Sequence, residues 1–344
     1  MPSRHKNLSI FVPHEGCPHR CSFCDQNAIS GTDERPTPEE VTRLCDRFLP
    51  ASPEEGADYE IAFFGGSFTA IERDYMIRLL EAAGPFVESG RASGIRCSTR
   101  PDAVDEEILD IYRRYGGTSI ELGAQSMNDT VLTLNRRGHT CRDVYRAARL
   151  IKEAGFSLGL QMMTGLYGRE PYRVDAMATA EAFARMGPDT VRIYPTLTLK
   201  NTLLARLYER GAYVPPALEE SVDLCAQLVP FFEERDIRVI KLGLHADRSL
   251  EESLVAGPYH PAFRELVESR ILYSDVLARL ERLGAGRYTV SVSPKEVSRM
   301  TGQSKENIRK LAERGFTVKV RPDSSLSGRN IEITGGIPSV FKGN

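Results

Sequence analysis

Short β-branched or apolar runs alternate with longer amphipathic runs over most of the chain. This alternation is typical of βα units around a parallel sheet, in which buried strands read as nearly continuous apolar segments. The expected strands are 8–12, 59–64, 94–99, 118–123, 157–163 and 190–195, with a weaker one at 237–242. Repeats of this kind, with no two alike in sequence, predict an α/β fold, a partial (β/α)6 TIM-like barrel rather than a solenoid.

Several helices between these strands carry boundary signals. The helix expected over 37–49 begins with Thr37 and Glu40 in the spacing of a capping box, and the helix expected over 141–154 is followed by Gly155. A capping box satisfies backbone N–H groups at a helix start, and glycine adopts the backbone conformation in which many helices end. Both signals support the division into βα units.

The pattern changes after about residue 245. Residues 246–284 read as turn and helix, with a Gly–Pro break at 257–258. A strand, two helices and two further strands are expected after residue 285. We therefore expect three parts: a core barrel over 1–245, a helical extension over 246–284 and a small basic α+β domain over 285–344.

Composition and charge narrow the functional classes. The 344 residues are 41% hydrophobic and 27% charged, which excludes a mainly disordered, collagenous or coiled-coil chain. A net charge of -2 excludes binding to nucleic acid or membrane through overall basicity. From residue 285 onward, however, eleven Lys and Arg residues face five Asp and Glu residues, so the last part carries +6 and the rest -8.

No apolar run in the sequence approaches the length of a membrane span, and residues 1–16 lack the apolar block of a signal peptide. A cytoplasmic enzyme without membrane contact is therefore expected. The seven cysteines are odd in number, and three of them fall within eight residues, which is not the pattern of a disulfide framework. The other four read as small hydrophobic residues: Cys45, Cys97, Cys141 and Cys225.

The three clustered cysteines are the strongest chemical signal. Cys17, Cys21 and Cys24 follow the first strand, at the end of a barrel where active sites form. Three thiolates can hold an iron–sulfur cluster and leave one iron open for a chelating ligand. A zinc site closed by His14 or His19 is the alternative, although structural zinc sites usually pair two spaced couples of ligands.

The C-x3-C-x2-C spacing, with an aromatic residue before the last cysteine, resembles the radical S-adenosylmethionine (radical SAM) superfamily. Gly65 and Gly66 in FFGGSF resemble the glycine-rich segment of that superfamily, which contacts the amino group of the methionine moiety. Further segments resemble the radical domain of the Elongator catalytic subunit family, over roughly residues 8–240: 98–102, 120–140, 161–168 and 191–213.

The resemblance implies a radical SAM enzyme with two cofactors, a [4Fe-4S] cluster and S-adenosyl-L-methionine. In that superfamily, one electron from the reduced cluster cleaves S-adenosylmethionine, and the 5'-deoxyadenosyl radical abstracts hydrogen from a substrate. A one-electron donor of the flavodoxin or ferredoxin type is the implied partner. Two features depart from the Elongator pattern. We expect no acetyl transfer, since the sequence has no room for the acetyltransferase domain, and Ser98 replaces the acidic residue before Thr-Arg-Pro-Asp.

The resemblance also implies roles for individual residues. The cluster ligands are Cys17, Cys21 and Cys24, and the implied cofactor-binding residues are Phe23, Gly65, Gly66, Ser67, Ser98, Gln125, Arg137 and Met162. Arg137, in RRGHT, resembles the residue that meets the methionine carboxylate, which suits the planar fork of a guanidinium. Phe23 and Met162 are alternatively core residues, with Met163 as the other candidate for the adenine pocket, and Gln125 alternatively bonds backbone. No residue is assigned to the catalytic step.

The substrate is not specified by these motifs. RNA or tRNA is one hypothesis, because the basic tail around Gly302 to Lys305 resembles a KH module, although Lys305 replaces its second glycine. A small metabolite is the alternative substrate. A catalytically idle, metal-bearing RNA-binding protein is the alternative from a different class.

Overall fold

Two compact units make up the chain, and each is described by itself. The computed structural model describes residues 6–13, 21–24, 35–56, 59–168, 171–244 and 248–337. Unit 1 consists of Met1–Ser221 and Pro230–Tyr259, and unit 2 consists of Val222–Val229 and His260–Asn344. Among the described residues, no helix combines the length and apolar character needed to cross a membrane.

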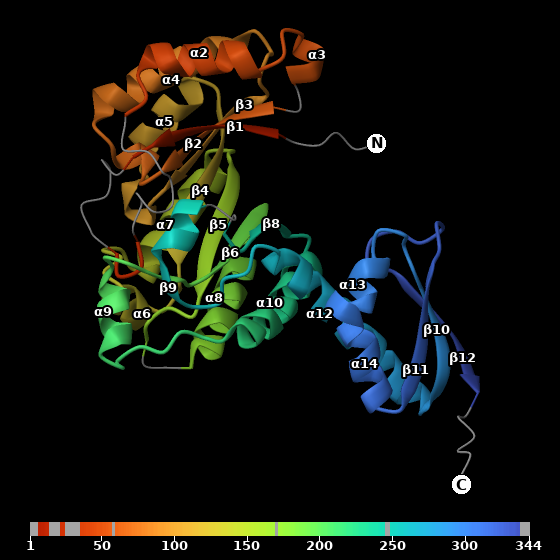
Figure 1. Cartoon of the computed structure of the whole chain (residues 1–344). Helices are drawn as coiled ribbons and strands as arrows, with labels where there is room; N and C mark the ends of the chain where they lie inside the picture. Colours follow the sequence, from red (N-terminus) through yellow and green to blue (C-terminus); the bar gives the residue numbers. More distant parts are fainter. Residues whose placement is uncertain are drawn as a thin grey trace. The chain divides into compact units, whose positions relative to one another are not determined.

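Unit 1 is built on a seven-stranded, wholly parallel sheet that curls into a half barrel (Figure 1). Its strands lie side by side in the order β1 (Lys6–Val12), β2 (Tyr59–Gly65), β3 (Gly94–Thr99), β4 (Gly117–Gln125), β5 (Ser157–Thr164), β6 (Thr190–Pro195) and β8 (Arg238–Leu242). Neighbours in the chain are almost always neighbours in the sheet, as right-handed βα crossovers produce. The predicted α/β half barrel and its seven strands are confirmed.

Helices follow the strands and cover the sheet. The longer ones are α2 (Pro38–Phe48), α4 (Arg73–Glu88), α5 (Glu106–Arg114), α7 (Cys141–Glu153), α8 (Tyr172–Met186) and α10 (Leu218–Glu233). The predicted capping box of α2 is confirmed: the Glu40 N–H donates to the Thr37 hydroxyl at 3.2 Å, and the Thr37 N–H donates to the Glu40 carboxylate at 3.0 Å. Gly155 follows α7 with a φ of 82°, a backbone conformation that glycine adopts without strain.

Shorter elements complete unit 1, and they include two strands that the sequence did not predict. The helical ones are α3 (Pro53–Gly56), η1 (Phe68–Ala70), η2 (Pro101–Ala103), α6 (Asp129–Leu134), α9 (Leu203–Glu209) and α11 (Arg248–Ser253). Strands β7 (Thr198–Leu199) and β9 (Leu254–Ala256) form a small antiparallel pair, and β9 lies inside the segment expected to be a helical extension. Elements of two or three residues are too short to produce a hydrophobic period.

Side chains alternate between the two faces of each strand of the half barrel. Ile61, Ile95 and Ile120 are fully buried on the face opposite the cavity described below. The alternate positions carry many polar residues. A buried example is Arg96, whose guanidinium donates to the Glu60 carboxylate at 2.8 Å. The concave face of the sheet therefore carries buried polar residues as well as apolar ones.

Unit 2 is a three-stranded sheet covered on one face by helices. Its elements are α12 (Phe263–Leu283), β10 (Gly286–Val292), α13 (Val297–Thr301), η3 (Gln303–Lys305), α14 (Glu306–Glu313), β11 (Phe316–Pro322) and β12 (Ile331–Ile337). The strand order is β11-β10-β12, with β10 parallel to β11 and antiparallel to β12. Side chains from α12 and the sheet, such as Val276, Val290 and Phe316, share one apolar core. The additional small α+β part at the C-terminal end is confirmed.

Candidate active site

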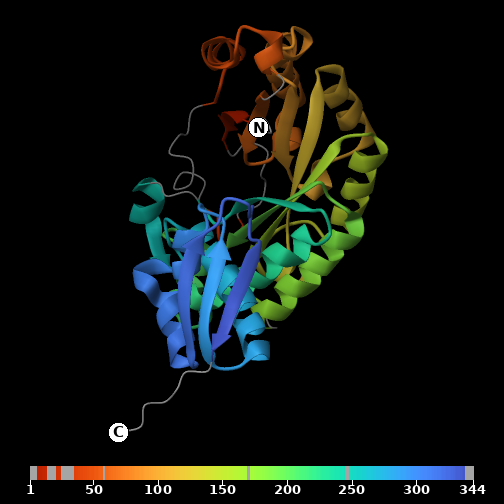
Figure 2. The same ribbon diagram turned by 90° about the vertical axis from the view of Figure 1, so that its right-hand side faces the viewer.

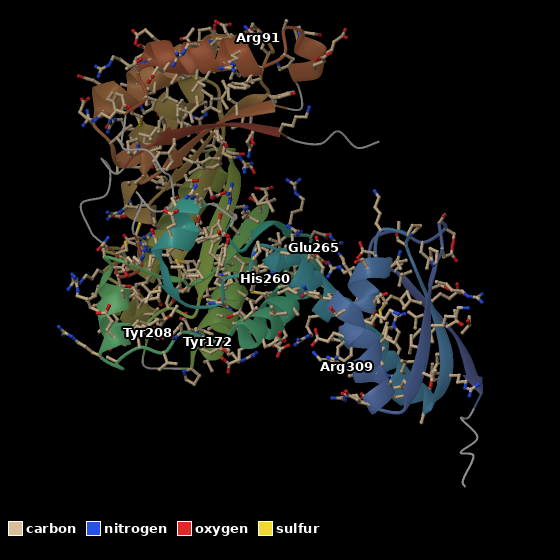
Figure 3. All side chains as sticks on the ribbon, in the orientation of Figure 1. Arg91, Tyr172, Tyr208, His260, Glu265 and Arg309 are labelled. Atoms are coloured by element: carbon tan, nitrogen blue, oxygen red, sulfur yellow. The ribbon has the colours of Figure 1, made fainter. Side chains whose placement is uncertain are left out.

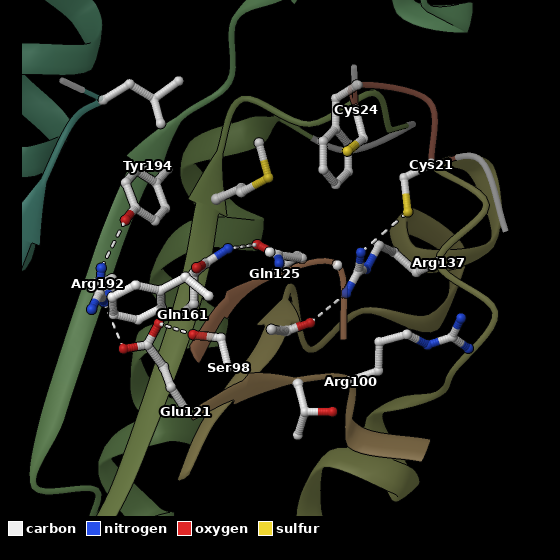
Figure 4. Close-up of a pocket in the computed structure, with 18 of the residues that line it drawn as sticks. Cys21, Cys24, Ser98, Arg100, Glu121, Gln125, Arg137, Gln161, Arg192 and Tyr194 are labelled. Carbon is white, nitrogen blue, oxygen red and sulfur yellow. Dashed lines mark hydrogen bonds and ion pairs between the residues drawn. The ribbon is translucent and has the colours of Figure 1, made fainter. Parts of the chain in front are cut away.

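A cavity of about 390 Å³ opens at the carboxyl ends of the parallel strands in unit 1 (Figure 4). This is the end at which βα barrels place their sites. The lining combines aromatic, thiol, amide and charged side chains. They are Phe11, Cys21, Phe23, Cys24, Phe64, Gly65, Gly66, Ser98, Thr99, Arg100, Glu121, Gly123, Gln125, Arg137, Gln161, Met163, Arg192, Tyr194, Pro195, Leu197, Leu199 and Leu244.

Two of the three clustered cysteines lie in the described part of the chain. Cys21 and Cys24 both line the cavity, and neither is in a disulfide. Cys17, like His14 and His19, lies outside the described residues. Within the described ranges, no three His, Cys, Asp or Glu side chains are grouped to hold a metal ion. A metal site at Cys21 and Cys24 would therefore need at least one further ligand.

Arg137 links these thiols to the sheet. Its guanidinium donates to Sγ of Cys21 at 3.2 Å and to the backbone oxygen of Gly123 at 2.6 Å (Figure 4). The Nε of Arg137 is buried and has no hydrogen-bond partner among the described residues. A buried donor of this kind usually has a partner, so this atom fits a bound acceptor.

Gly65 and Gly66, at the end of β2, lie close to the backbone of Val12 at the end of β1. Gly65 has a φ of 135°, and a Cβ at this position would lie 1.9 Å from the backbone oxygen of Val12. The N–H of Gly66 donates to the same oxygen at 3.3 Å. Both glycines line the cavity, and the close approach to Val12 requires glycine at position 65. Ser67, by contrast, is buried beside the cavity, and its hydroxyl accepts from the N–H of Arg100 at 3.0 Å.

A polar cluster on the floor of the cavity was not predicted from the sequence. The Ser98 hydroxyl donates to one oxygen of Glu121 at 3.2 Å, and Nε of Arg192 donates to the other at 2.6 Å (Figure 4). Arg192 also donates to the Tyr194 hydroxyl at 3.4 Å. Burial, the largest single influence, lowers the pKa of Arg192. The charges of Glu121 and Tyr194 and the hydrogen bonds to both together outweigh burial, so the net direction of the pKa is upward. The pKa of Tyr194 is raised by burial.

These residues occupy alternate positions of neighbouring strands, which places them on one face of the sheet. Glu121 and Gln125 are four residues apart on β4, and Arg192 and Tyr194 are two apart on β6. Gln161, on the strand between them, donates to the side-chain oxygen of Gln125 at 3.1 Å. Glu121 and Arg192 are single charged residues within largely apolar strands, and their pairing across the intervening strand has no local signal in the sequence.

Gln125 and the methionine pair are the remaining predicted positions. Gln125 lines the cavity with a φ of 69°, at an irregularity in the pairing of β4 with β5. Met162 is fully buried and is not among the lining residues, whereas Met163 lines the cavity. Of the two methionines, the structure therefore places Met163 rather than Met162 at the cavity, because successive strand residues point to opposite faces. The structure thus brings Cys21, Phe23, Cys24, Gly65, Gly66, Ser98, Gln125 and Arg137 around one cavity.

His139 lies behind the site rather than in it. It is buried, and its Nε2 lies 3.2 Å from the backbone oxygen of Ala124, next to Gln125. Burial, with the nearby charge of Arg137, lowers the pKa of His139 to about 4. The imidazole is therefore neutral near pH 7 and supports the end of β4.

Comparison with known proteins gives two family matches. Residues 11–191 match the model of the radical SAM superfamily, and residues 188–272 match the model of the Radical_SAM C-terminal domain. Together they reach from the strand before the cysteines into α12.

Curated relatives match over the same region. A tRNA uridine(34) acetyltransferase of Methanocaldococcus jannaschii is 26% identical over 255 residues, which are 63% of this chain and 47% of that protein. Elongator complex protein 3 of Danio rerio is 33% identical over 235 residues, 62% of this chain and 41% of that protein. The chain thus spans somewhat under half the length of these relatives.

Among solved structures, archaeal Methanocaldococcus infernus Elp3 with an N-terminal deletion is similar, with a TM-score of 0.61 and 21% identity. The match covers 79% of this chain and 64% of that one. At this identity the likeness shows a shared fold.

Proposed function

This chain belongs to the radical SAM superfamily, and from that membership we propose that it cleaves S-adenosylmethionine reductively and uses the resulting radical on RNA. The observation that carries the proposal is the cavity in which two thiols, a buried guanidinium and a glycine pair meet. When bound, a [4Fe-4S] cluster supplies the electron that cleaves S-adenosylmethionine, and the 5'-deoxyadenosyl group so released abstracts a hydrogen atom from substrate.

We assign Cys17, Cys21 and Cys24 as the thiolates that hold the cluster. The donor set fits this group, because Cys21 and Cys24 border the cavity and soft thiolates are the ligands that iron–sulfur clusters take. Arg137 orients the Cys21 side chain at the cavity through its hydrogen bond to Sγ.

The other lining residues hold S-adenosylmethionine in this proposal. Arg137 directs its unpartnered Nε to the methionine carboxylate, and the Gly65–Gly66 segment leaves backbone groups accessible to the amino group. Phe23 offers an aromatic face, and its ring lies 6.0 Å from the Arg137 guanidinium. Ser67 supports the pocket from behind through its bond to the Arg100 N–H.

Ser98 stands where the Elongator family carries an acidic residue, yet a carboxylate still reaches this part of the cavity. The Ser98 hydroxyl is bonded to Glu121, whose side chain comes from the adjacent strand. The carboxylate can accept hydrogen bonds from ribose hydroxyls, and the serine hydroxyl can donate or accept them. We therefore assign the ribose contact to Ser98 with Glu121, together with Gln125.

RNA is the proposed substrate class because the named relatives include a tRNA-modifying enzyme and because the last 60 residues carry a net charge of +6, against -8 for the rest of the chain. The reaction centre would then lie in unit 1, and part of the RNA contact would lie in unit 2.

Anaerobic reconstitution tests the chemistry. The protein should bind about four iron and four sulfide per chain, which Cys21→Ala should abolish. Cys45→Ala is the matched control, because Cys45 is buried in α2 and burial raises its pKa to about 12, which leaves the thiol protonated and inert.

The same preparation, given dithionite and S-adenosylmethionine, should form methionine and 5'-deoxyadenosine in wild type and Cys45→Ala but not in Cys21→Ala. Stoichiometric zinc without iron, or equal loss in both variants, would contradict the proposal. Product formation that a small metabolite accelerates and RNA does not would contradict RNA as the substrate.

A further inference from the structure

The sheet of unit 2 has one face that its helices leave uncovered. Figure 2 shows the three strands in front of the helices of this unit. Alternate residues on the covered face, such as Val290, Val318 and Ile333, contribute to the apolar core of the unit. The residues between them on the three strands point to the opposite face.

This open face, defined by Arg287, Thr289, Ser291, Thr317, Lys319, Arg321, Glu332 and Thr334, is polar throughout. The strand pairings set its members side by side: Arg287 lies opposite Thr317, Thr289 lies between Lys319 and Thr334, and Ser291 lies between Arg321 and Glu332. Three cations and one carboxylate therefore share a surface otherwise made of hydroxyl groups.

The cations of the open face differ from most others in unit 2. On the helices, Lys310 is 2.7 Å from Glu306, Arg314 is 3.1 Å from Glu281, and Arg309, labelled in Figure 3, is 3.9 Å from Glu313. Within the described part of the chain, Arg287, Lys319 and Arg321 have no carboxylate within 4.0 Å. The positive charge of α14 is thus locally balanced, whereas that of the open face is not.

We propose that the open face binds the phosphate backbone of RNA. This inference rests on the proposed function. It assigns the RNA contact to the sheet rather than to α14 and its N-cap, which carry Lys305, Arg309 and Lys310. The open face consists mainly of Lys, Arg, Ser and Thr side chains. Lys and Arg neutralise phosphates, and Ser and Thr hydroxyls donate to phosphate and sugar oxygens.

The composition of the face argues against other partners. None of the eight residues that define the face is aromatic or aliphatic, so they do not supply the apolar centre of a stable protein interface or the apolar residues of a membrane-inserting surface. They also offer no ring on which a base could stack. The expected binding is therefore electrostatic, with little discrimination between RNA sequences and a steep dependence on salt.

The test compares two triple variants of the full chain that remove the same charge. The first is Arg287→Gln with Lys319→Gln and Arg321→Gln on the open face. The matched control is Arg309→Gln with Lys310→Gln and Arg314→Gln on the helical side. Binding of a fluorescein-labelled, unmodified tRNA transcript is measured by anisotropy over a series of salt concentrations, and circular dichroism checks that each variant is folded.

The open-face variant should bind about tenfold or more weakly at low salt, and its slope of log affinity against log salt should fall by about 2 to 3, since each phosphate contact contributes about 0.7 to 0.9. The control should change little. Replacing Arg287 and Arg321 with Lys should retain binding, because the contact needs charge rather than a planar fork. Equal loss in both triple variants, or loss in the helical variant alone, would overturn the proposal.

Two further measurements separate the possible failures. If polyglutamate binds the wild type as tightly as the tRNA transcript does, the partner of the face is an acidic protein and the RNA assignment is wrong. Substrate-free formation of 5'-deoxyadenosine should be the same in both triple variants. Its absence from wild type would count against the proposed chemistry and leave the result for the open face intact.

Discussion

At the scale of single residues, the site depends on a few buried polar groups whose partners are incomplete. Arg137 has satisfied donors on one side, toward Cys21 and Gly123, and an unsatisfied Nε on the other. A buried guanidinium in this state is costly unless an acceptor completes it. We therefore expect Arg137 to contribute to the free energy of S-adenosylmethionine binding.

Replacing Arg137 with Ala should weaken S-adenosylmethionine binding by about 1 to 3 kcal/mol, the scale of a lost hydrogen bond to a charged group. Isothermal titration on anaerobic, cluster-loaded protein measures this change, with iron content determined in parallel. Arg136→Ala is the control, because Arg136 is adjacent in sequence but exposed. A dissociation constant unaffected by Arg137→Ala would remove this residue from the cofactor site.

His139 leads to a prediction about pH. Its folded-state pKa of about 4 lies below the ordinary value of 6.5, so between these values the unfolded chain binds a proton that the folded chain does not. Stability should therefore fall as the pH is lowered through this window, by up to about 3 kcal/mol from this group.

Urea denaturation of wild type and His139→Gln at pH 7 and pH 4 isolates that contribution, because all other titrating groups are shared. The wild type should lose more stability than the variant on acidification. Parallel losses in the two proteins would show that His139 is not buried as a neutral group.

At the scale of elements, the strands and helices of the half barrel were predictable because each buries a long apolar run with clear boundary residues. Eight of the residues named from the motifs line the cavity. The Glu121–Arg192 pair was not predictable, because each residue sits singly within an apolar strand and the pairing joins β4 to β6 across β5. The sequence also did not decide between Met162 and Met163, because a shift of one residue along a strand moves a side chain to the opposite face of the sheet.

Gly65 shows how one junction between elements constrains the site. Gly65→Ala should lower the free energy of unfolding by more than about 3 kcal/mol, because it combines an unfavourable φ with a contact to the Val12 backbone. Gly155→Ala is the matched control: its φ is also positive, but no atom lies within 4 Å of the added Cβ, so only about 1 to 2 kcal/mol should be lost. Equal losses in denaturant titrations would show that the close approach of β1 and β2 is unimportant.

At the scale of the whole molecule, chemistry and charge are separated. Every residue that lines the cavity belongs to unit 1, whereas the apolar core formed around β10 belongs to unit 2. Cleavage of S-adenosylmethionine should therefore tolerate damage to unit 2 that RNA binding does not.

Two neighbouring substitutions on β10 test this separation. Val290 is fully buried in the core of unit 2, so Val290→Asp places an unpaired charge there and should unfold the unit. Thr289→Asp adds the same charge on the open face and should leave the unit folded. Calorimetry should show the loss of one unfolding transition in Val290→Asp alone. Both variants should bind tRNA more weakly: Val290→Asp because unit 2 unfolds, and Thr289→Asp because its carboxylate repels phosphate. In both, substrate-free 5'-deoxyadenosine formation should stay at the wild-type rate. Loss of that activity in Val290→Asp would mean that the half barrel needs unit 2 to hold its site.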